Sequence, residues 1–195
     1  MSDNILSIRG KTPIIADDAF IASTAVVIGD VEIGSGSGIW YHCVVRGDIN
    51  EIRIGENTNI QDGSVVHVDR FTYGTFIGNN ITVGHMCLIH ACRLEDNCMV
   101  GMHATVMDGA VVETGALVAA KALISPGKRV PAGQVWAGQP GKYLCDVKEA
   151  QQAMMDRIAP GYVELAGEFR AAGLDIRDLD ATLSQMDTPT ADVGD

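Results

Sequence analysis

A six-residue period of aliphatic side chains runs through more than half of the 195-residue chain and limits the folds that are open to it. The period falls into four runs, which are separated by a slip of three residues, a longer slip and a one-residue deletion. An aliphatic anchor every six residues is typical of a parallel β-helix. The nineteen anchors are Ile15, Ile21, Val27, Ile33, Ile39, Val45, Ile54, Ile60, Val66, Ile77, Val83, Ile89, Leu94, Val100, Val106, Val112, Val118, Ile124 and Val130. A small residue often stands two positions before an anchor, at Ala19, Ala25, Ser37, Cys43, Ser64, Cys87, Cys92, Cys98, Ala104, Ala110, Ala116 and Ala122.

The fold implied by this repeat is a stack of triangular coils. Three hexads make one coil of about eighteen residues, and successive coils lie about 4.8 Å apart. The anchors therefore predict about six coils, none of which can bury its apolar edge alone. We expect an all-β domain over residues 15–145, preceded by an N-terminal segment over residues 1–14.

The repeat ends in a Pro- and Gly-rich segment, PAGQVWAGQPGKYL, and the sequence then becomes helical. We expect a C-terminal helix over residues 146–173, with Pro160 and Gly161 kinking or breaking it. Tyr162, Leu165 and Phe169 fall on one stripe of this helix, which predicts that it packs along the β-helix. Residues 174–195 form an acidic tail, and we expect at least its last ten residues to be mobile.

Charge and composition exclude several classes of function. The formal net charge of −11 opposes binding to nucleic acid or to an anionic membrane, because both require clustered Lys and Arg. The N-terminal sequence MSDNILSIRG lacks a basic segment followed by an apolar one, so we expect no signal peptide. No apolar run is long enough to span a membrane. With five Cys and no CxxC pair, these features predict a cytoplasmic protein with reduced thiols.

Most of the cysteines have a structural explanation. Cys43, Cys87, Cys92 and Cys98 occupy the small position of the repeat, which they share with Ala and Ser. We therefore interpret them as buried small hydrophobic residues without a redox or metal-binding role. Cys145 lies outside the repeat and has no evident role.

The register of the repeat places two histidines on one wall of the β-helix. Anchors three hexads apart lie one coil above the other and form a column. Arg46, His67 and His90 each directly follow an anchor of the same column. His67 and His90 should therefore stack, with Arg46 one coil below. By the same rule Asp62 should lie beneath His85, on a different wall, because both follow anchors of another column by two positions.

These histidines predict a metal site that is shared between subunits. Two imidazoles one strand spacing apart can bind one metal ion, and a catalytic zinc site has three protein ligands and a water. His85 lies on the wrong wall to complete the set within one chain, but a neighbouring subunit can supply it. Because a triangular prism packs naturally into a cyclic trimer, we predict a homotrimer with three interface sites. Each would hold Zn²⁺, or Co²⁺ or Fe²⁺, between His67 and His90 of one subunit and His85 of another.

Ordinary structural roles remain open for other polar residues. His42 and His103 fall in turns, where a single His is usually a surface residue or a hydrogen-bonded one, and we assign them no role. Arg46 and Asp48 are placed to form an ion pair at a subunit edge. That pair could be structural, catalytic or both.

The sequence resembles the γ-class carbonic anhydrases and their relatives over most of residues 10–145. The resemblance rests on VVRGDINEIRIGENTNIQDGSVVHVD, residues 44–69, and ITVGHMCLIHACRLEDNCMVGMHATVMDGAVV, residues 81–112. RGD, NIQDG, VGH and a His five residues later are specific in combination. The resemblance implies a left-handed β-helix that forms a homotrimer with metal at the subunit interfaces. By similarity, the metal ligands are His67, His85 and His90, and an intersubunit salt bridge joins Arg46 and Asp48.

The same resemblance implies an activity and further site residues. The reaction would be the reversible hydration of CO₂ to bicarbonate, in which the metal lowers the pKa of a bound water to near 7 and the resulting metal-bound hydroxide attacks CO₂. Gln61 and Asn59 match residues near the metal-bound water, and Gln61 would orient the nucleophile. Asp62 matches an acidic residue near the site. Tyr162 matches an active-site Tyr on the C-terminal helix.

The sequence departs from the best-characterised archaeal enzyme of that family in its proton-transfer residues. That enzyme carries a Glu directly after RGD and an acidic loop with a shuttle Glu soon after the first metal His. This chain has Ile49 after RGD, and its short loop, DRFTYGTF, carries only one acid, Asp69. We therefore predict metal binding with weak hydratase activity.

Two other functions are compatible with the sequence. GQPGKYL, residues 138–144, resembles the segment that follows the β-helix in hexapeptide acyltransferases. Such a transferase, or an acyl-CoA thioesterase, would use one general-base His and no set of three metal ligands. The three histidines in register favour the metal-dependent anhydrase over this alternative. A catalytically silent trimeric scaffold is the third hypothesis.

Overall fold

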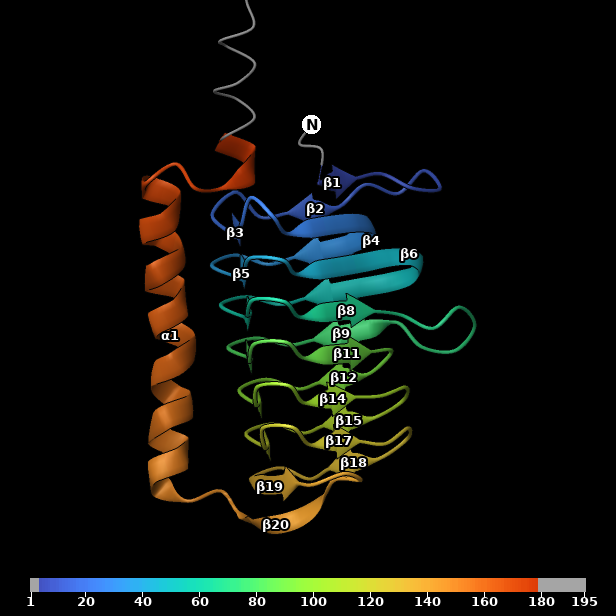
Figure 1. The fold of residues 1–195 in the computed structure, drawn as a ribbon, viewed down its shortest axis with the longest axis vertical. Coiled ribbons are helices and arrows are strands. Elements are labelled where there is room, and N and C mark those ends of the chain that lie inside the picture. Colours follow the sequence, from blue (N-terminus) through green and yellow to red (C-terminus); the bar gives the residue numbers. More distant parts are fainter. Residues whose placement is uncertain (1–3, 179–195) are drawn as a thin grey trace, which may run out of the picture.

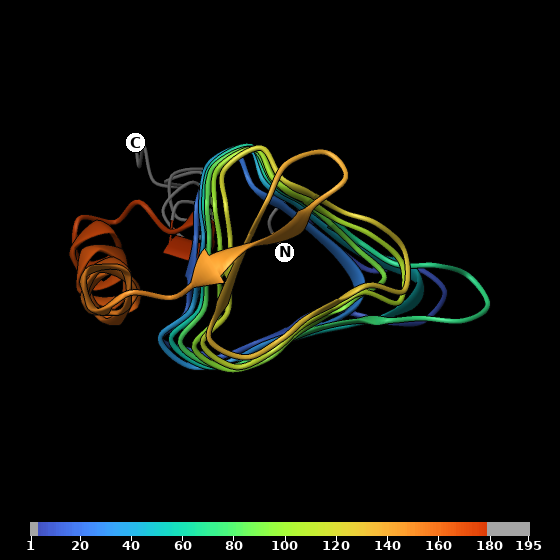
Figure 2. The same cartoon turned by 90° about the horizontal axis from the view of Figure 1, so that it is seen from below.

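The computed structural model of the protein describes residues 4–178. It shows a left-handed parallel β-helix of roughly seven turns with one long C-terminal helix, which confirms the predicted fold class. Figure 1 shows the coils stacked along the long axis of the molecule, and Figure 2 shows their triangular cross-section. The predicted mobility of the last ten residues concerns residues 186–195, which lie outside the described part of the chain.

One wall of the triangle is covered by the C-terminal helix, and we call it the helix wall (Figures 1 and 2). Its sheet has eight strands in the described part of the chain, and only β20 is antiparallel to its neighbour. The strands are β3 (Phe20–Ile21), β5 (Gly38–Ile39), β7 (Asn59–Ile60), β10 (Thr82–Val83), β13 (Met99–Val100), β16 (Leu117–Val118), β19 (Gln134–Ala137) and β20 (Lys142–Asp146).

The other two walls belong to one sheet, because two long strands, β4 (Val26–Ile33) and β6 (Val44–Ile54), run from one wall onto the next. We call the first of these the histidine wall, since His67 and His90 end two of its strands. Besides the first halves of β4 and β6, it contains β1 (Ile5–Leu6), β8 (Val65–His67), β11 (Leu88–His90), β14 (Thr105–Val106) and β17 (Leu123–Ile124). The third wall contains the second halves of β4 and β6 with β2 (Ile14–Ile15), β9 (Thr75–Ile77), β12 (Arg93–Leu94), β15 (Val111–Val112) and β18 (Arg129–Val130).

The interior of the β-helix is filled by the anchors of the repeat. Eighteen of the nineteen anchors are buried, and only Ile15, in the first coil, is partly exposed. All twelve small residues two positions earlier are buried as well. Cys43, Cys87, Cys92 and Cys98 pack among them without forming disulfides. Burial raises the pKa of the Cys87 thiol to about 11, which keeps this thiol protonated at neutral pH.

The repeat continues for one rung beyond the last predicted anchor. Trp136 lies six residues after Val130 and pairs with Val118 in the helix wall. The predicted pattern contained aliphatic anchors only and therefore ended one rung too early. Together with β1, which pairs with β4 ahead of the first predicted anchor, this rung extends the predicted six coils to the roughly seven that are observed.

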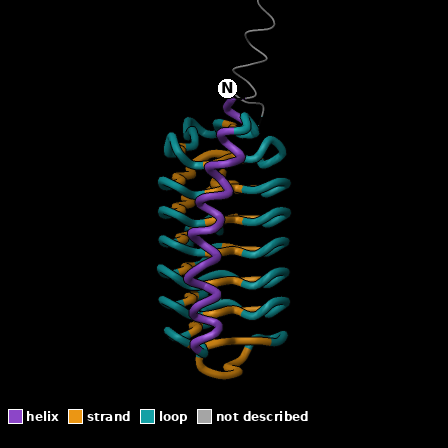
Figure 3. Tube along the Cα trace, turned by 90° about the vertical axis from the view of Figure 1, so that its left-hand side faces the viewer, coloured by secondary structure: helices purple, strands orange, loops and turns teal. Residues whose placement is uncertain are grey.

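Helix α1 (Glu149–Ala171) runs along the helix wall and crosses most of the coils, as Figure 3 shows. Trp40 on the wall lies between two aromatic rings of the helix, with centroid distances of 5.3 Å to Tyr162 and 5.2 Å to Phe169. The predicted stripe of apolar residues therefore packs against the β-helix. The helix does not break at Pro160, although Pro removes one backbone hydrogen bond. Burial of Met155, Ala159 and Ala166 on both sides of Pro160 holds its two halves against the wall. No helix among the described residues is both long and apolar enough to cross a membrane.

The chain after α1 contacts the N-terminal end of the β-helix, although the sequence predicted an acidic tail from residue 174 onward. The carboxylate of Asp175, only 1% exposed, accepts a hydrogen bond from the backbone N–H of Ile21 at 2.9 Å. It also pairs with Arg177, whose Nε lies 2.8 Å away. Arg177 in turn donates to backbone carbonyl oxygens of the first coil. Asp175 is therefore a buried residue that attaches the segment after α1 to the first coil and closes one end of the fold.

We predict that Asp175→Asn lowers the free energy of unfolding by about 2 kcal/mol at pH 7, because it leaves Arg177 without its charged partner. Burial raises the pKa of Asp175, but hydrogen bonds from Arg177 and Ile21 outweigh this effect and hold the pKa below 3.8. The carboxylate therefore stabilises the fold above about pH 4, and the effect is lost as the pH falls through the lowered pKa. Urea unfolding at pH 7 and pH 3 measures the difference, with Asp156→Asn on the exposed side of α1 as the control. A destabilisation that is equal at both pH values would contradict the prediction.

Candidate metal centre

The histidine wall brings two imidazoles into direct contact. His67 ends β8, His90 ends β11, and the two residues pair in the parallel register between these strands. Nδ1 of His67 lies 3.2 Å from Nε2 of His90, and both rings are largely buried. The predicted stacking of His67 and His90 is confirmed. Two ring nitrogens that face each other at this distance are suited to bind a common cation.

A carboxylate contacts the second nitrogen of each of these rings. Oδ1 of Asp48 lies 3.0 Å from Nε2 of His67, and Oδ1 of Asp108 lies 2.6 Å from Nδ1 of His90. Metal-binding histidines commonly have such a partner, which fixes the orientation and tautomer of the ring. The surroundings of this pair therefore have the form of a metal site.

Arg46 pairs with Asp48 within the chain, and the pair between subunits that the resemblance implies stays a prediction. Burial raises the pKa of Asp48, but hydrogen bonds from His67 and Arg46 and the positive charge of Arg46 outweigh it and keep the pKa below 3.8. Burial also lowers the pKa of His67, and Asp48 offsets this only in part. His67 is therefore neutral near pH 7, which is the form that binds metal.

The third histidine lies at the corner between the helix wall and the histidine wall. Nδ1 of His85 lies 2.9 Å from Oδ2 of Asp62, as the pairing of Ile60 with Val83 requires. The predicted position of Asp62 beneath His85 is confirmed. Asp62 contacts the Nδ1 side of the ring, and Nε2 of His85 has no hydrogen-bond partner among residues 4–178.

An amide pair stands beside this corner. The side chain of Gln61 is 4% exposed, and its Nε2 donates to Oδ1 of Asn59 at 3.1 Å. Asn59 is itself fixed, because its amide nitrogen donates to the hydroxyl of Thr82 at 3.0 Å. The carbonyl oxygen of Gln61 is thereby left as a hydrogen-bond acceptor of fixed position.

Gln61 and His85 line a groove between α1 and the helix wall, and Tyr162 of α1 faces the same groove. The groove has a volume of about 520 Å³. Burial and the negative charge of Asp62 raise the pKa of Tyr162 above 10. The hydroxyl of Tyr162 is therefore protonated at neutral pH and can donate a hydrogen bond.

The predicted site residues thus form two groups on different parts of the prism. Arg46, Asp48, His67 and His90 lie together on the histidine wall, and the second group consists of Asn59, Gln61, Asp62, His85 and Tyr162. Within residues 4–178 no group of three or more His, Cys, Asp or Glu side chains is arranged to hold a metal ion. Within the described chain the three histidines are therefore divided between these two groups.

Asp108, which contacts His90, was not singled out from the sequence. It stands two residues after the anchor Val106, which pairs with Ile89 in the neighbouring coil. His90 follows Ile89 by only one residue, so the equal spacing that placed Asp62 beside His85 does not predict this contact. His42 and His103, by contrast, are exposed residues with positive φ in turns.

The residues that replace the family's proton-shuttle glutamates are unsuited to proton transfer at neutral pH. Ile49 is partly buried and packs against the core. The carboxylate of Asp69 accepts hydrogen bonds from the hydroxyl and backbone N–H of Thr72 and from the backbone N–H of Phe71. These bonds lower the pKa of Asp69 to about 2, so it is not protonated near pH 7.

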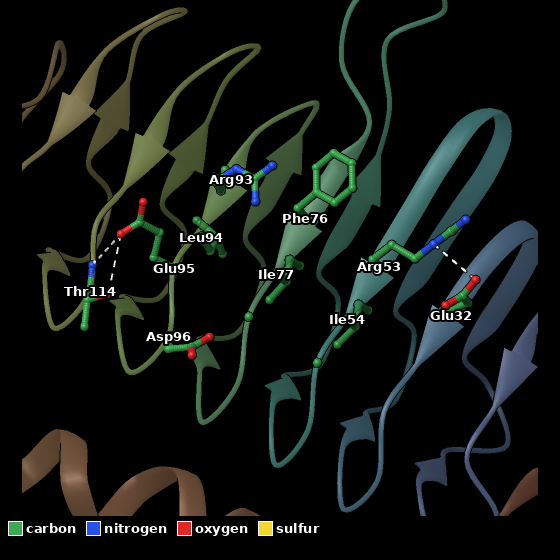
Figure 4. Close-up of a pocket in the computed structure, with 12 residues that line it drawn as sticks. Glu32, Arg53, Ile54, Phe76, Ile77, Arg93, Leu94, Glu95, Asp96 and Thr114 are labelled. Carbon is green, nitrogen blue, oxygen red and sulfur yellow. Dashed lines mark hydrogen bonds and ion pairs between the residues drawn. The ribbon is translucent and has the colours of Figure 1, made fainter.

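Another depression lies on the third wall, and Figure 4 shows its lining. Its charged side chains are largely engaged with neighbours, as Arg53 is with Glu32 and as Glu95 is with Thr114. None of the predicted site residues lines it. The depression is therefore no part of the candidate centre.

Comparison with known proteins gives several relatives, although no family model matches the chain. "Gamma carbonic anhydrase 2, mitochondrial" from Arabidopsis thaliana is 44% identical over 167 residues, which are 83% of this chain. The chain covers only 60% of the length of that relative. A probable carbonic anhydrase from Methanocaldococcus jannaschii is 39% identical over 152 residues, which are 78% of this chain and 95% of that protein.

A solved structure shares the fold over most of both chains. It is a hexapeptide transferase family protein from Anaplasma phagocytophilum, with a TM-score of 0.81 and 43% sequence identity. The match covers 84% of this chain and 96% of that one.

Proposed function

Because the chain belongs to the γ-carbonic anhydrase-like family of hexapeptide-repeat proteins, we propose that it is a metal-dependent enzyme that interconverts CO₂ and bicarbonate. The distribution of the three histidines carries this proposal. His67 and His90 lie in contact on one wall, and His85 lies at a corner with a free ring nitrogen. A homotrimer in which His85 of one subunit approaches His67 and His90 of the next completes the site.

The outer face of the histidine wall supports a trimer. The residue before each anchor points outward on this wall, and these residues form a row that is aliphatic in five of six coils. An apolar row on the outside of a β-helix is suited to contact another subunit. The row consists of Val26, Val44, Val65, Leu88, Thr105 and Leu123.

The donor set fits a divalent transition metal. Three imidazoles suit Zn²⁺, and Co²⁺ and Fe²⁺ as well, and a different carboxylate, from Asp48, Asp62 or Asp108, holds each ring. A bound divalent ion would act as a Lewis acid and lower the pKa of a coordinated water to near 7.

Two residues of the second group would then act on the substrate. The carbonyl oxygen of Gln61, fixed through Asn59, accepts a hydrogen bond from the attacking water and orients it. The protonated hydroxyl of Tyr162 donates a hydrogen bond to a substrate oxygen in the same groove. No group of the 68–74 loop takes up the released proton near pH 7, because the pKa of Asp69 is about 2. Proton release to external buffer therefore limits the rate.

Acyl transfer or acyl-CoA thioester hydrolysis is the second candidate function. The groove of about 520 Å³ favours it, since this volume is much larger than CO₂ requires. The orienting carboxylate on each of the three histidines favours the anhydrase, because a general base needs only one such pair. For either activity we propose a reducing, cytoplasmic setting, which five free thiols support.

Stopped-flow CO₂ hydration on protein with a measured metal content tests the proposal. We expect about one Zn²⁺ or Co²⁺ per chain and slow hydration that accelerates as the buffer concentration rises. The acceleration follows because Asp69, the acid of the 68–74 loop, does not take up a proton near pH 7. Full metal content with turnover of acyl-CoA thioesters and without hydration would contradict the anhydrase assignment.

Sharing of the site between subunits is tested by mixing two inactive variants. His67→Ala and His85→Ala should each lose most of the bound metal. When both variants are co-expressed in equal amounts and assemble at random, about one quarter of all interfaces combine an intact His67 with an intact His85. We therefore expect a corresponding recovery of bound metal. A site built within one chain would show no recovery, and His103→Ala, in an exposed turn of the same corner, should retain full metal content.

Asp108→Asn should weaken metal binding about tenfold to a hundredfold, because the amide no longer fixes the ring of His90 as a carboxylate does. Competition with a chelator measures the affinity, and the visible spectrum of the Co²⁺-loaded protein reports the ligand geometry. Unfolding of the metal-free protein should change little. The exposed Asp156→Asn is the matched control, and equal affinities for the two variants would contradict the prediction.

A further inference from the structure

The apolar part of the groove beside α1 has no side chain that fills it. Below Gln61, His85 and Tyr162 it is lined by apolar groups, among them Met99, Leu117 and Met154. The rim residues Met102 and Leu144 are 55% and 63% exposed. An exposed apolar surface of this kind next to a polar site is typical of a place where another group binds.

The loop between β8 and β9, residues 68–74, carries an apolar side chain without a place to pack. It projects from the corner between the histidine wall and the third wall, as Figures 1 and 2 show. Phe71 at its tip is 86% exposed. Tyr73, by contrast, packs over Gly109 of its own chain.

The loop holds Phe71 in a defined position. The carboxylate of Asp69 accepts hydrogen bonds at 2.8 Å from the backbone N–H groups of Phe71 and Thr72. The amide of Asn50 donates to the carbonyl oxygen of Asp69 at 3.1 Å, which ties the base of the loop to β6. Phe71 is therefore presented to the surroundings by an ordered turn.

The proposed trimer brings this loop to the groove. A threefold axis parallel to the coil axis keeps equivalent coils of all subunits at the same height. When His85 of one subunit approaches His67 of another, the loop that directly follows His67 passes the corner that carries His85. Beyond that corner lies the helix wall of the other subunit, where the groove begins at Gln61 and Gly84.

We infer that Phe71 of one subunit packs into the groove of the next and covers the metal centre from the side of Gln61 and Tyr162. This inference rests on the proposed trimeric site. Phe71 thereby takes up part of the apolar surface of the groove and narrows access to the centre. The cover admits a small substrate such as CO₂ and excludes long acyl chains, so Phe71 is a specificity-determining residue that a partner subunit supplies.

Photo-crosslinking tests the contact directly. Phe71 is replaced by p-benzoylphenylalanine, and this protein is mixed with ¹⁵N-labelled wild-type chains before irradiation. We expect crosslinked peptides of mixed isotope composition that join position 71 to Met102 or Leu144 of the other chain. The same probe in place of Ile14, which is 66% exposed on the third wall, should not reach the groove. Crosslinks within one chain only, or none, in a protein that is trimeric and binds metal would overturn the inference and leave the proposed function intact.

A second measurement uses the apolar dye 8-anilinonaphthalene-1-sulfonate. Phe71→Ala should uncover the groove, so the fluorescence of the bound dye should rise severalfold while trimer mass and metal content stay unchanged. Ile14→Ala, which removes an exposed apolar side chain from the third wall, is the control and should leave the fluorescence at the wild-type level. Equal dye binding by wild type and Phe71→Ala contradicts the inference. A wild-type protein that does not form a trimer would instead overturn the proposed function.

Discussion

The hydrogen bonds between successive coils are the constraint on which the rest of the molecule depends. They fix each strand in parallel register with the strands above and below, so the place of a residue in its hexad decides its wall and its direction. The width of the prism leaves room for one aliphatic anchor per wall and for a small side chain at each corner. Ala, Ser and Cys recur in the corner position for this reason, and all twelve are buried.

Insertions are absorbed at the corners and do not disturb this register. Leu88 pairs with Thr105, 17 residues later, but His67 pairs with His90, 23 residues later. The difference is accommodated by the loop of residues 68–74, which leaves the prism and returns to it. The two histidines consequently stack as closely as ordinary rungs do, and the insertion adds a loop directly after His67.

The period of the sequence was sufficient to predict the coils and the contacts of both histidine groups. Once anchors define the columns, the pairs His67–His90 and Asp62–His85 follow from counting. Three features were missed for separate reasons. Asp108 contacts His90 although the two residues stand at different spacings from their anchors, so counting alone does not pair them. Trp136 is an anchor that is not aliphatic. The continuity of α1 through Pro160 depends on packing against the helix wall, which the helical segment alone does not reveal.

The three histidines are already oriented within one chain. Asp48 and Asp108 hold the rings of His67 and His90, while Asp62 holds His85. In the proposed trimer, subunit assembly would only bring these oriented groups together. The 68–74 loop is also ordered within one chain. Its only acid, Asp69, accepts the hydrogen bonds of a tight turn, and these bonds lower the pKa of Asp69 to about 2. A loop that carries a proton shuttle in the family's archaeal enzyme is here built to present an aromatic side chain.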